Sequence, residues 1–514
     1  MNPQIANLKF CALYFLLTFG FLWPTTHLSA QTRKFFVDAI SGNDQNDGSS
    51  PEKAFKSISR LNGLRLLGGE QLLFKGGQQF KGNLKLTGIH SGIKNPFIVS
   101  AFGSSRATIL SGDSVAILAT DCIYLTISNL IIEGSGRLTG NKTNGIDFLE
   151  VKNGTIDNVK TSGYLYSGIQ VTGGSNIRIT NVNASNNGFC GINVLSSAKE
   201  YGPNGSAFKT VKRVYIGHSV AENNPGCPAI TDNHSGNGIL MGGVTDGLIE
   251  YCEAMNNGWD MPREGNGPVG IWAYMSDSIV IQHCYSHHNK TSPKGKDGGG
   301  FDFDGGITNS IMQYNLSAYN EGGGYGMFQY AGATEWSNNI VQYNISYNDG
   351  SKNGKCGIFM WCDPAATPMK QLKAYNNTIV NNQGYGVNFE PGNYLDFVFG
   401  NNIFVLTVPS DCFTGGLFSG ATFDHNLYWT ELQNRPATTP EINPIFSDPQ
   451  IKLPKNQQFK FKRIEEINSI GQFQLSSKSP AKKAGKPIEN NGGKDYWQNP
   501  ISLVEKPNIG AYGK

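Results

Sequence analysis

The sequence has little net charge. Its 42 Lys and Arg residues nearly balance its 39 Asp and Glu residues, which leaves a formal charge of +3 over 514 residues. Proteins that bind nucleic acid or an anionic membrane through a basic surface usually carry a clear excess of positive charge. The near balance therefore argues against a nucleic-acid partner and against a polybasic membrane-binding protein.

Long apolar runs are also absent once the first thirty residues are passed. Lys9 is the only charged residue before an apolar run from Phe10 to Trp23, and the small residues Ser29 and Ala30 precede Gln31. This pattern predicts a signal peptide over residues 1–30 that is cleaved near Ala30, with an uncleaved membrane anchor as the alternative. We therefore expect an exported protein, secreted or periplasmic, with no membrane span in the mature chain.

Glycine is abundant, at 64 residues, but it lacks the G-X-Y period of collagen. Glycine together with many Asn residues and short β-rich runs predicts a chain that turns often. Of the nine cysteines, Cys11 lies in the predicted signal peptide. Export permits disulfides among the other eight, but Cys252 and Cys284 occupy matching positions of a repeat and can equally be small buried hydrophobic residues.

A short motif of Gly, apolar, variable and apolar residues recurs from about residue 120. Its spacing is about 23 residues at first and then about 26 to 32, with one step of double length near residue 200. The motif begins at Gly145, Gly168, Gly191, Gly238, Gly270, Gly300, Gly326, Gly357 and Gly386. A second short strand and an Asn-rich turn follow most copies.

The repeat lacks the fixed Leu pattern of leucine-rich repeats and the four strands per ~40 to 45 residues of a propeller. Strands this short cannot each bury a face alone, so we expect parallel rungs stacked around one continuous core. The Asn residues at one corner predict a ladder of side-chain amides. We expect a single domain over residues 31–514, with an N-terminal cap to about residue 70, rungs over about 70–430, and an irregular segment over about 431–514.

The chain resembles the secreted right-handed parallel β-helix proteins of the pectate-lyase-like superfamily. The resemblance rests on the repeats, on the N-terminal stretch from Phe36-Val37 to Ser50-Pro51, and on the C-terminal stretches Ile442–Phe446, Leu475–Pro480 and Pro507–Tyr512. It implies an all-β solenoid fold, and a protein that cleaves or binds polysaccharides by hydrolase or lyase chemistry. It is specific for the fold and weak for the reaction, because fold does not fix function.

One repeat, from Lys296 to Gly306, carries the candidate catalytic residues. If Gly300–Phe303 forms a strand, Phe301 and Phe303 point to the core while Asp302 and Asp304 point out, because side chains alternate. Carboxylates at i and i+2 lie roughly 6 to 7 Å apart, near the lower end of the ~6.5 to 9.5 Å found in inverting glycosidases. Asp302 and Asp304 are therefore predicted as acid and base, with Asp297 beside them on the preceding loop.

Aromatic residues occupy the outward columns around these carboxylates when the strands are aligned on their leading Gly. Sugars suit such a surface, because ring faces stack and hydroxyls form hydrogen bonds, although each ring can instead pack under a loop. The predicted substrate-binding residues are Trp272, Tyr274, Phe328, Tyr330, Trp361, Asp363, Glu390, His288 and Lys290, with Asp363 and Glu390 at distal subsites. The expected partner is a polysaccharide or oligosaccharide, bound by a monomer.

Three hypotheses stay open. The first is a glycoside hydrolase that uses the paired Asp residues without a cofactor. The second is a polysaccharide lyase for a uronate-containing glycan, in which Asp297, Asp302 and Asp304 hold Ca²⁺. Its base would come from Arg263, His287, His288, Lys290, Lys294 or Lys296. The third is a non-catalytic β-helix that binds glycan.

Overall fold

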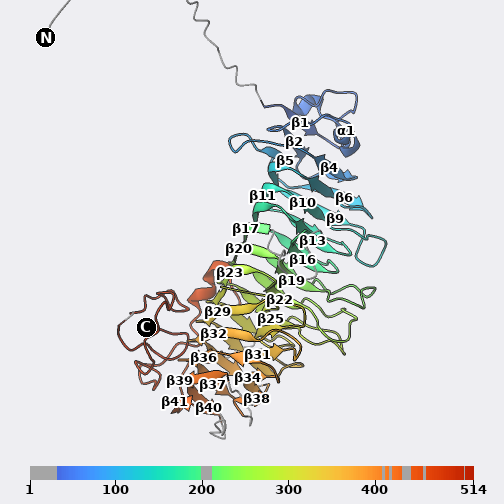
Figure 1. Ribbon diagram of the computed structural model, residues 1–514. Coiled ribbons are helices and arrows are strands. Elements are labelled where there is room, and N and C mark those ends of the chain that lie inside the picture. The colour runs from blue at the N-terminus through green and yellow to red at the C-terminus, as the bar shows by residue number, and fades with distance from the viewer. Residues whose placement is uncertain are drawn as a thin grey trace, which may run out of the picture. The chain divides into compact units, whose positions relative to one another are not determined.

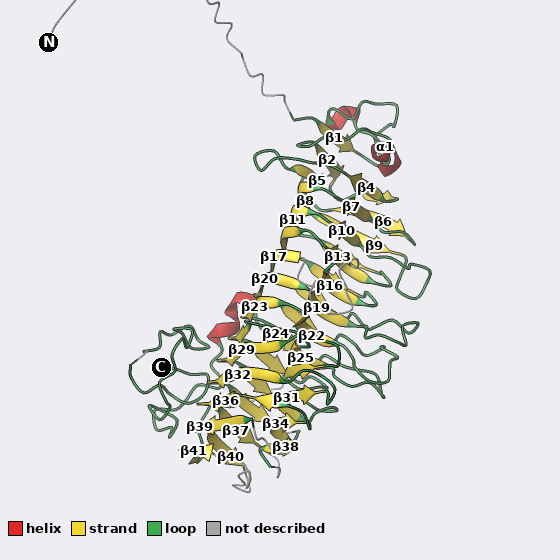
Figure 2. Ribbon diagram, viewed as in Figure 1, coloured by secondary structure: helices red, strands yellow, loops and turns green. Residues whose placement is uncertain are grey.

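Three parallel β-sheets form the body of the unit from Arg33 to Lys514 (Figures 1 and 2). The structure is a computed structural model that describes residues 32–197, 211–381, 383–407, 411–415, 420–430, 441–454, 459–502 and 504–514. The predicted signal peptide lies outside the described residues. None of the described helices is long and apolar enough to cross a membrane.

Each turn of the chain adds one strand to each sheet, so that most strands pair with the strand three places further along. The 16-stranded sheet contains β1 (Lys34–Val37), β2 (Gln71–Lys75), β5 (Phe97–Phe102), β8 (Ile123–Ser128), β11 (Lys152–Asp157), β14 (Ser175–Thr180), β17 (Val211–Gly217), β20 (Val244–Glu250), β23 (Asp277–Gln282), β26 (Ile311–Gln313), β29 (Trp336–Gln342), β32 (Met369–Tyr375), β35 (Tyr394–Leu395), β36 (Phe397–Gly400), β39 (Ala421–Asp424) and β41 (Glu441–Ile442). The 12-stranded sheet contains β4 (Leu84–Thr87), β7 (Ile117–Thr120), β10 (Ile146–Leu149), β13 (Ser167–Thr172), β16 (Cys190–Leu195), β19 (Asn237–Gly242), β22 (Val269–Tyr274), β25 (Gly299–Phe303), β28 (Tyr325–Gln329), β31 (Cys356–Cys362), β34 (Tyr385–Phe389) and β38 (Phe413–Gly415). The 14-stranded sheet contains β3 (Gln79–Lys81), β6 (Ala107–Gly112), β9 (Leu130–Gly134), β12 (Lys160–Ser162), β15 (Asn183–Ser185), β18 (Val220–Glu222), β21 (Glu253–Met255), β24 (Tyr285–His287), β27 (Leu316–Ala318), β30 (Ile345–Tyr347), β33 (Thr378–Asn381), β37 (Ile403–Leu406), β40 (Leu427–Thr430) and β42 (Ile445–Phe446).

The apolar residues of the repeat form columns along the interior, as predicted. Ile169 lies beside Ile192, and Ile271 lies beside Phe301, on neighbouring strands of the 12-stranded sheet. All four side chains are fully buried. Because each strand covers the apolar face of the next, the short strands share one core.

The stack of strands is longer than predicted at both ends. In the cap, β1 already pairs with β2, and the short helix α1 (Ile58–Asn62) follows a 3₁₀ turn at Pro51–Lys53. At the other end, β41 and β42 continue the stack beyond residue 430. The chain after β42 is irregular apart from a 3₁₀ helix at Ile464–Ser469.

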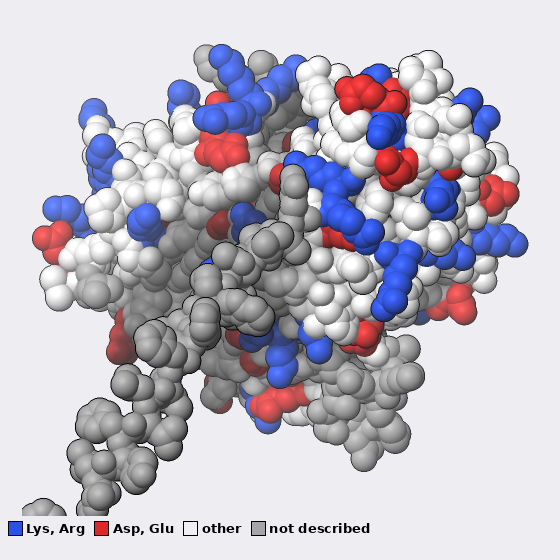
Figure 3. Space-filling view, turned by 90° about the horizontal axis from the view of Figure 1, so that it is seen from above, with Lys and Arg blue, Asp and Glu red and all other residues white. Residues whose placement is uncertain are grey.

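This C-terminal segment packs back on the 14-stranded sheet, where Figure 1 draws it beside the body. Ile467, Phe473 and Tyr496 are buried in one cluster with Leu316 and Ile345 of the sheet. The segment therefore covers an apolar outer face of the solenoid. On the face seen in Figure 3, basic and acidic side chains are both scattered, in keeping with the balanced composition.

The predicted ladder of Asn side chains is present. Asn257 Nδ2 donates to Asn289 Oδ1 (2.9 Å), and Asn289 Nδ2 donates to Asn320 Oδ1 (3.0 Å). The full ladder runs through Asn187, Asn224, Asn257, Asn289, Asn320 and Asp349. A second ladder, which the sequence analysis did not identify, runs through Asn315, Asn344, Asn377, Asn402 and Asn426 to Glu441.

The eight cysteines of the described residues are all free and buried. Cys252 and Cys284 lie in the hydrophobic core, where each thiol donates to backbone carbonyls. Cys252 and Cys284 are therefore small buried hydrophobic residues, and they do not form disulfides.

The Asn289 ladder position gives a test of the fold. Asn289→Ala removes the acceptor of Asn257 Nδ2 and leaves buried polar groups without partners, each of which costs roughly 1 to 3 kcal/mol. We expect a clear fall in the denaturant midpoint, measured by circular dichroism. Asn95→Ala, at an exposed position, should leave the midpoint unchanged. Equal midpoints for the two variants would contradict a stabilising ladder.

Candidate functional site

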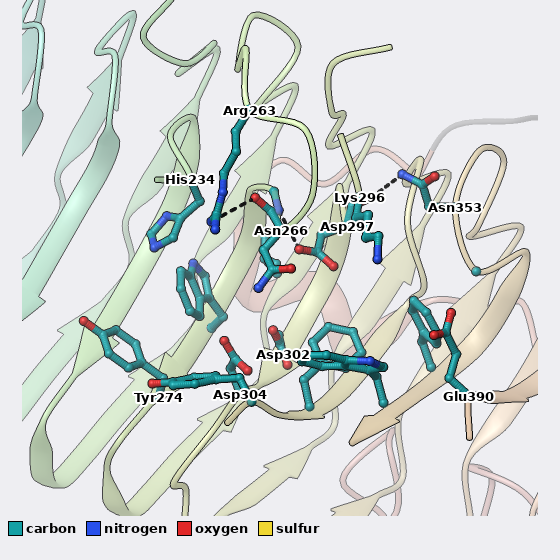
Figure 4. A pocket seen from close by; sticks show the side chains of 18 of the residues that line it. His234, Arg263, Asn266, Tyr274, Lys296, Asp297, Asp302, Asp304, Asn353 and Glu390 are labelled. Carbon is teal, nitrogen blue, oxygen red and sulfur yellow. Dashed lines mark hydrogen bonds between the residues drawn. The ribbon is translucent and has the colours of Figure 1, made fainter. Parts of the chain in front are cut away.

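A cavity of about 500 Å³ opens on the 12-stranded sheet, in the size range of ligand sites. Its lining comes from β22, β25, β28 and β31, from the loops that precede β19, β22, β25 and β31, and from residues that follow β25, β28 and β34 (Figure 4). The lining residues are Asn233, His234, Arg263, Asn266, Gly267, Val269, Trp272, Tyr274, Lys296, Asp297, Asp302, Asp304, Phe328, Tyr330, Asn353, Gly354, Phe359, Trp361 and Glu390.

Asp302 and Asp304 lie side by side in this cavity, and Asp297 faces them from the loop before β25 (Figure 4). The alternation on β25 produces this placement, because Phe301 and Phe303 fill the core and send the two carboxylates outward. Asp302 is only 3% exposed, whereas Asp304 and Asp297 are half-buried. These three carboxylates thus differ in how far they are buried.

The carboxylate of Asp302 lacks the support that buried polar groups usually have. Its Oδ1 atom is buried and has no hydrogen-bond partner among the described residues. The neighbouring position on β28 is Gly326. A Cβ atom at residue 326 would lie 3.1 Å from Asp302 Oδ1 and 2.8 Å from the ring of Phe328. Glycine therefore keeps open the space beside this carboxylate.

The predicted alignment of the β28 repeat was wrong by two residues. It placed Phe328 beside Asp302 and Tyr330 beside Asp304, whereas the structure pairs Gly326 with Asp302 and Phe328 with Trp361. The reason is that Gly324, not Gly326, leads this strand, and Tyr325 takes the interior position next to Phe301. A slip of two residues keeps every side chain on its face, so Phe328 and Tyr330 still line the cavity.

Asp297 is fixed by the two loops on either side of it. Its Oδ2 atom accepts a hydrogen bond from the Gly267 N–H (2.6 Å), and its carbonyl oxygen accepts one from Asn353 Nδ2 (3.2 Å). Its φ of 55° lies in the left-handed region, which Asp tolerates better than most residues. Loop contacts, rather than a strand, thus hold this carboxylate over the cavity.

Burial raises the pKa values of all three carboxyls. Burial is the main cause for Asp302, whose pKa lies well above its usual range, and the charges of Asp304 and Asp297 add to it. Burial and the charge of Asp297 raise the pKa of Asp304 to about 7, against the Gly305 N–H that donates to it. Burial raises the pKa of Asp297 to about 6, against the Gly267 N–H and the positive charges of Lys296 and Arg263. One proton shared within such a group suits acid–base chemistry.

Aromatic rings form two walls around the carboxylates. On one side the Trp272 ring stacks on Tyr274, with centroids 5.5 Å apart. On the other side Phe328 meets Phe359 edge-on at 5.2 Å and Trp361 at 6.4 Å. Flat aromatic surfaces beside a few carboxylates are typical of a site that binds a ring-shaped ligand with polar groups at its edge.

His234 belongs to the wall formed by Trp272, and the sequence analysis did not identify it. Its ring lies 5.0 Å from that of Trp272. Asn237 orients both rings, because its Nδ2 donates to His234 Nδ1 (2.9 Å) and its Oδ1 accepts from Trp272 Nε1 (3.1 Å). Burial lowers the pKa of His234 to about 4, with a contribution from Arg263. A neutral His234 therefore presents its Nε2–H as a donor.

Asn266 and Asn353 also line the cavity without having been predicted. Both lie on loops that enter strands of the 12-stranded sheet, as His234 does. The one sequence signal for them was the variable length of the repeat at these loops, since insertions in a solenoid gather on loops.

Several predicted residues lie outside the cavity. His288 and Lys290 follow β24 of the 14-stranded sheet, and His288 Nδ1 contacts His287 Nδ1 at 2.7 Å. Burial and the neighbouring His287 lower the pKa of His288 to about 4. Asp363 lies in the turn after β31, where its Oδ1 accepts from the Ala365 N–H (2.8 Å). None of the three lines the cavity, so their assignment as substrate-binding residues is corrected.

Some of the other residues that the sequence predicted for the site line the cavity, and others do not. Arg263, Lys296 and Glu390 line the cavity. By contrast, Lys294 pairs with Glu264 in solvent (2.6 Å), and His287 pairs with Glu253 (3.0 Å). Of the basic residues named in the lyase hypothesis, Arg263 and Lys296 therefore lie in the cavity, whereas Lys294 and His287 do not line it.

The described residues contain no group of three or more His, Cys, Asp or Glu side chains arranged to hold a metal ion. Asp297, Asp302 and Asp304 were the predicted Ca²⁺ ligands. Asp297 instead turns one oxygen to the Gly267 N–H. The three carboxylates as arranged do not fit a shared Ca²⁺ ion, which takes six to eight oxygen ligands.

Comparisons with known proteins agree with the fold. The family described as "Right handed beta helix region" matches residues 213–404. The native crystal structure of GH136 lacto-N-biosidase from Eubacterium ramulus shares 16% identity and a TM-score of 0.52, over 81% of this chain and 68% of that chain. The selenomethionine derivative of the same protein shares 17% identity and a TM-score of 0.51, over 79% of this chain and 68% of that chain. Pectate lyase Pel9A shares 14% identity over 94% of this chain and 97% of that chain, with a TM-score of 0.47. No curated protein matches the chain. The chain is thus a right-handed parallel β-helix protein, as the sequence predicted.

The raised pKa of Asp302 gives a test that needs no substrate. A carboxyl whose pKa is higher in the folded state destabilises the fold once it ionises, so stability falls as pH rises above the unfolded value near 3.8. We expect Asp302→Asn to melt at a higher temperature than the wild type at pH 8 and at the same temperature at pH 4. Asp232→Asn, on an exposed loop, should change neither value. A loss of stability at pH 8 in Asp302→Asn would contradict the raised pKa of Asp302.

Proposed function

We propose that the protein is an exported glycoside hydrolase, in which Asp302 is the general acid and Asp304 the general base. The observation that carries this proposal is the group of carboxyls with raised pKa values between two aromatic walls. A buried acid beside an ionisable base is what hydrolysis of a glycosidic bond requires.

The environments of the two residues suggest which carboxyl holds the proton. Asp302 is more deeply buried, has an unpartnered oxygen and has the higher pKa, so it keeps its proton at neutral pH and can protonate the leaving oxygen. Asp304 is half-buried and accepts the Gly305 N–H, which favours its ionised form. An ionised Asp304 can then activate water. Asp297 raises the pKa values of both.

The two aromatic walls can each bind a sugar ring, one on each side of the carboxyls. The half-buried rings of Tyr274 and Trp361 offer surface for stacking, and His234 and Asn266 offer donors and acceptors for hydroxyls. The same fold carries a lacto-N-biosidase in Eubacterium ramulus, so a β-helix is compatible with glycoside cleavage. The proposed substrate is a polysaccharide or oligosaccharide, and the proposed active form is an exported monomer that needs no cofactor.

A lyase is the second candidate, because two cationic residues share the cavity with the carboxyls. Arg263 and Lys296 line the cavity with the carboxyls (Figure 4) and can neutralise a uronate carboxylate, and Lys296 can remove a proton. The products separate the two candidates. A lyase leaves an unsaturated uronate that absorbs in the ultraviolet, whereas a hydrolase leaves only new reducing ends.

Substitution of Asp302 and of Asp304 tests the proposal directly. On the polysaccharide that the wild type cleaves in a panel screen, Asp302→Asn and Asp304→Asn should each lower kcat by about 10² or more, because each removes a proton-transfer group. Reducing-end release measures the rate. Asp363→Asn, outside the cavity, is the matched control and should keep wild-type activity. Wild-type rates in both cavity variants, or ultraviolet-absorbing products, would refute the assignment.

Asp297→Asn tests the electrostatic part of the mechanism. The wild type should show a bell-shaped pH–rate profile, rising as Asp304 ionises near pH 7 and falling as Asp302 loses its proton at higher pH. Because the charge of Asp297 raises both pKa values, its removal should move both limbs to lower pH. The limbs belong to the coupled pair rather than to single residues. Limbs that stay in place, or move to higher pH, would contradict the proposed role of Asp297.

A further inference from the structure

Arg137 lies outside the cavity, on the loop between β9 and β10, yet it connects two loops that build the cavity wall. Its Nη1 donates to the Gly226 carbonyl (3.0 Å), and its Nη2 pairs with Asp260 Oδ2 (2.6 Å). Its guanidinium also lies over the Trp259 ring, 5.7 Å from the centroid. The side chain is only 13% exposed. Arg137 and Asp260 are 123 residues apart in the sequence.

The loop of Arg137 is itself anchored to neighbouring rungs. The Gly136 N–H donates to the Gly163 carbonyl (2.9 Å), and the buried Asn141 donates to the Gly112 carbonyl (2.8 Å). A guanidinium held at its base can fix the position of whatever it contacts, because its planar donors bind an oxygen in a defined direction.

The two loops that Arg137 contacts also touch each other. The Asp260 N–H donates to the Pro225 carbonyl (2.6 Å), and a Cβ atom at Gly226 would lie 2.7 Å from the Met261 nitrogen. Each loop continues to a cavity residue. Residues 223–236 carry His234, and residues 256–268 carry Gly267, whose N–H holds Asp297.

We propose that Arg137 is a positioning residue for the cavity: it holds the loop of residues 256–268 in the place from which Gly267 donates to Asp297. None of these described contacts of Arg137 is with a residue that lines the cavity, so Arg137 acts on the cavity through Trp259, Asp260 and Gly226. Arg137 would hold this loop in place whichever glycan the protein cleaves. The closing experiment therefore has readouts without substrate as well as with it.

The first readout is hydrogen exchange of the backbone amides. In Arg137→Ala, peptides covering residues 223–236 and 256–268 should exchange at least about tenfold faster, because these loops lose the hydrogen bond and the ion pair that join them to the loop of Arg137. Arg137→Lys should restore part of the protection, since Lys can pair with Asp260 but lacks the planar donors. Arg106→Ala is the matched control. It removes a guanidinium that binds the carbonyl of Asn158 (3.1 Å) away from the cavity, and it should leave these peptides unchanged.

The second readout reports on Asp297. Tryptophan fluorescence should titrate near pH 6 through Trp272 and Trp361, and this step should vanish in Asp297→Asn. Asp297 is faced by Lys296, Arg263, Glu390, Asp302 and Asp304, none of which is substituted in the Arg137 variants. Loss of the Gly267 N–H bond should raise the step in Arg137→Ala by roughly one pH unit. Arg106→Ala should not move it.

The third readout is cleavage, and it connects the wall to the proposed function. On a glycan that the wild type cleaves, Arg137→Ala should lower kcat/KM about tenfold, with partial recovery in Arg137→Lys. If Arg137→Ala fails to fold, Asp260→Asn weakens the same ion pair and should give the same three changes. Unchanged exchange or an unmoved fluorescence step overturns the positioning role. A wild type without activity on any glycan overturns the proposed function instead and leaves the first two readouts to decide on Arg137.

Discussion

In-register stacking of one rung on the next is the constraint on which this structure depends. Each strand of the 12-stranded sheet takes its backbone partners from the strands before and after it, so its register decides which side chains meet. The Asn ladders also fix the register, because each amide binds the amide and the backbone of neighbouring rungs. Register therefore sets both the core and the cavity, and Asp302 next to Gly326 is one of its results.

Much of the fold could be predicted because the chain repeats one local pattern. The period of the motif predicted stacked parallel rungs, and the two-residue alternation predicted that Phe301 is buried while Asp302 faces out. The alignment of β28 failed because its strand holds two glycines at spacing two, Gly324 and Gly326, and the pattern cannot tell which one leads. What decides between the two glycines is a tertiary contact, because the Tyr325 ring stacks on Phe301 in the interior column only when Gly324 leads the strand.

The cavity was only half predictable, because strands and loops encode position differently. Residues on strands inherit their neighbours from the register, so Trp272 and Trp361 were found. Residues on loops take their positions from contacts between distant segments, such as that of Arg137 with Asp260. The repeat pattern does not predict contacts of this kind. Closeness in sequence was misleading for His288, since the chain passes from one sheet to another between it and Asp302. His234 was missed for the converse reason, because it is far from Asp302 in sequence.

The same rigidity explains how three carboxyls can remain together at partial burial. Each pKa unit by which burial raises a carboxyl corresponds to about 1.4 kcal/mol of unfavourable free energy once the group ionises. A site on a mobile surface would relax by turning its carboxylates to water. Here β25 pairs with β22 on one side and with β28 on the other, so a shift of the backbone at Asp302 would displace Phe301 and Phe303 from the core. The solenoid thus keeps a locally unfavourable arrangement in place, and an acid with a raised pKa is the chemical property that results.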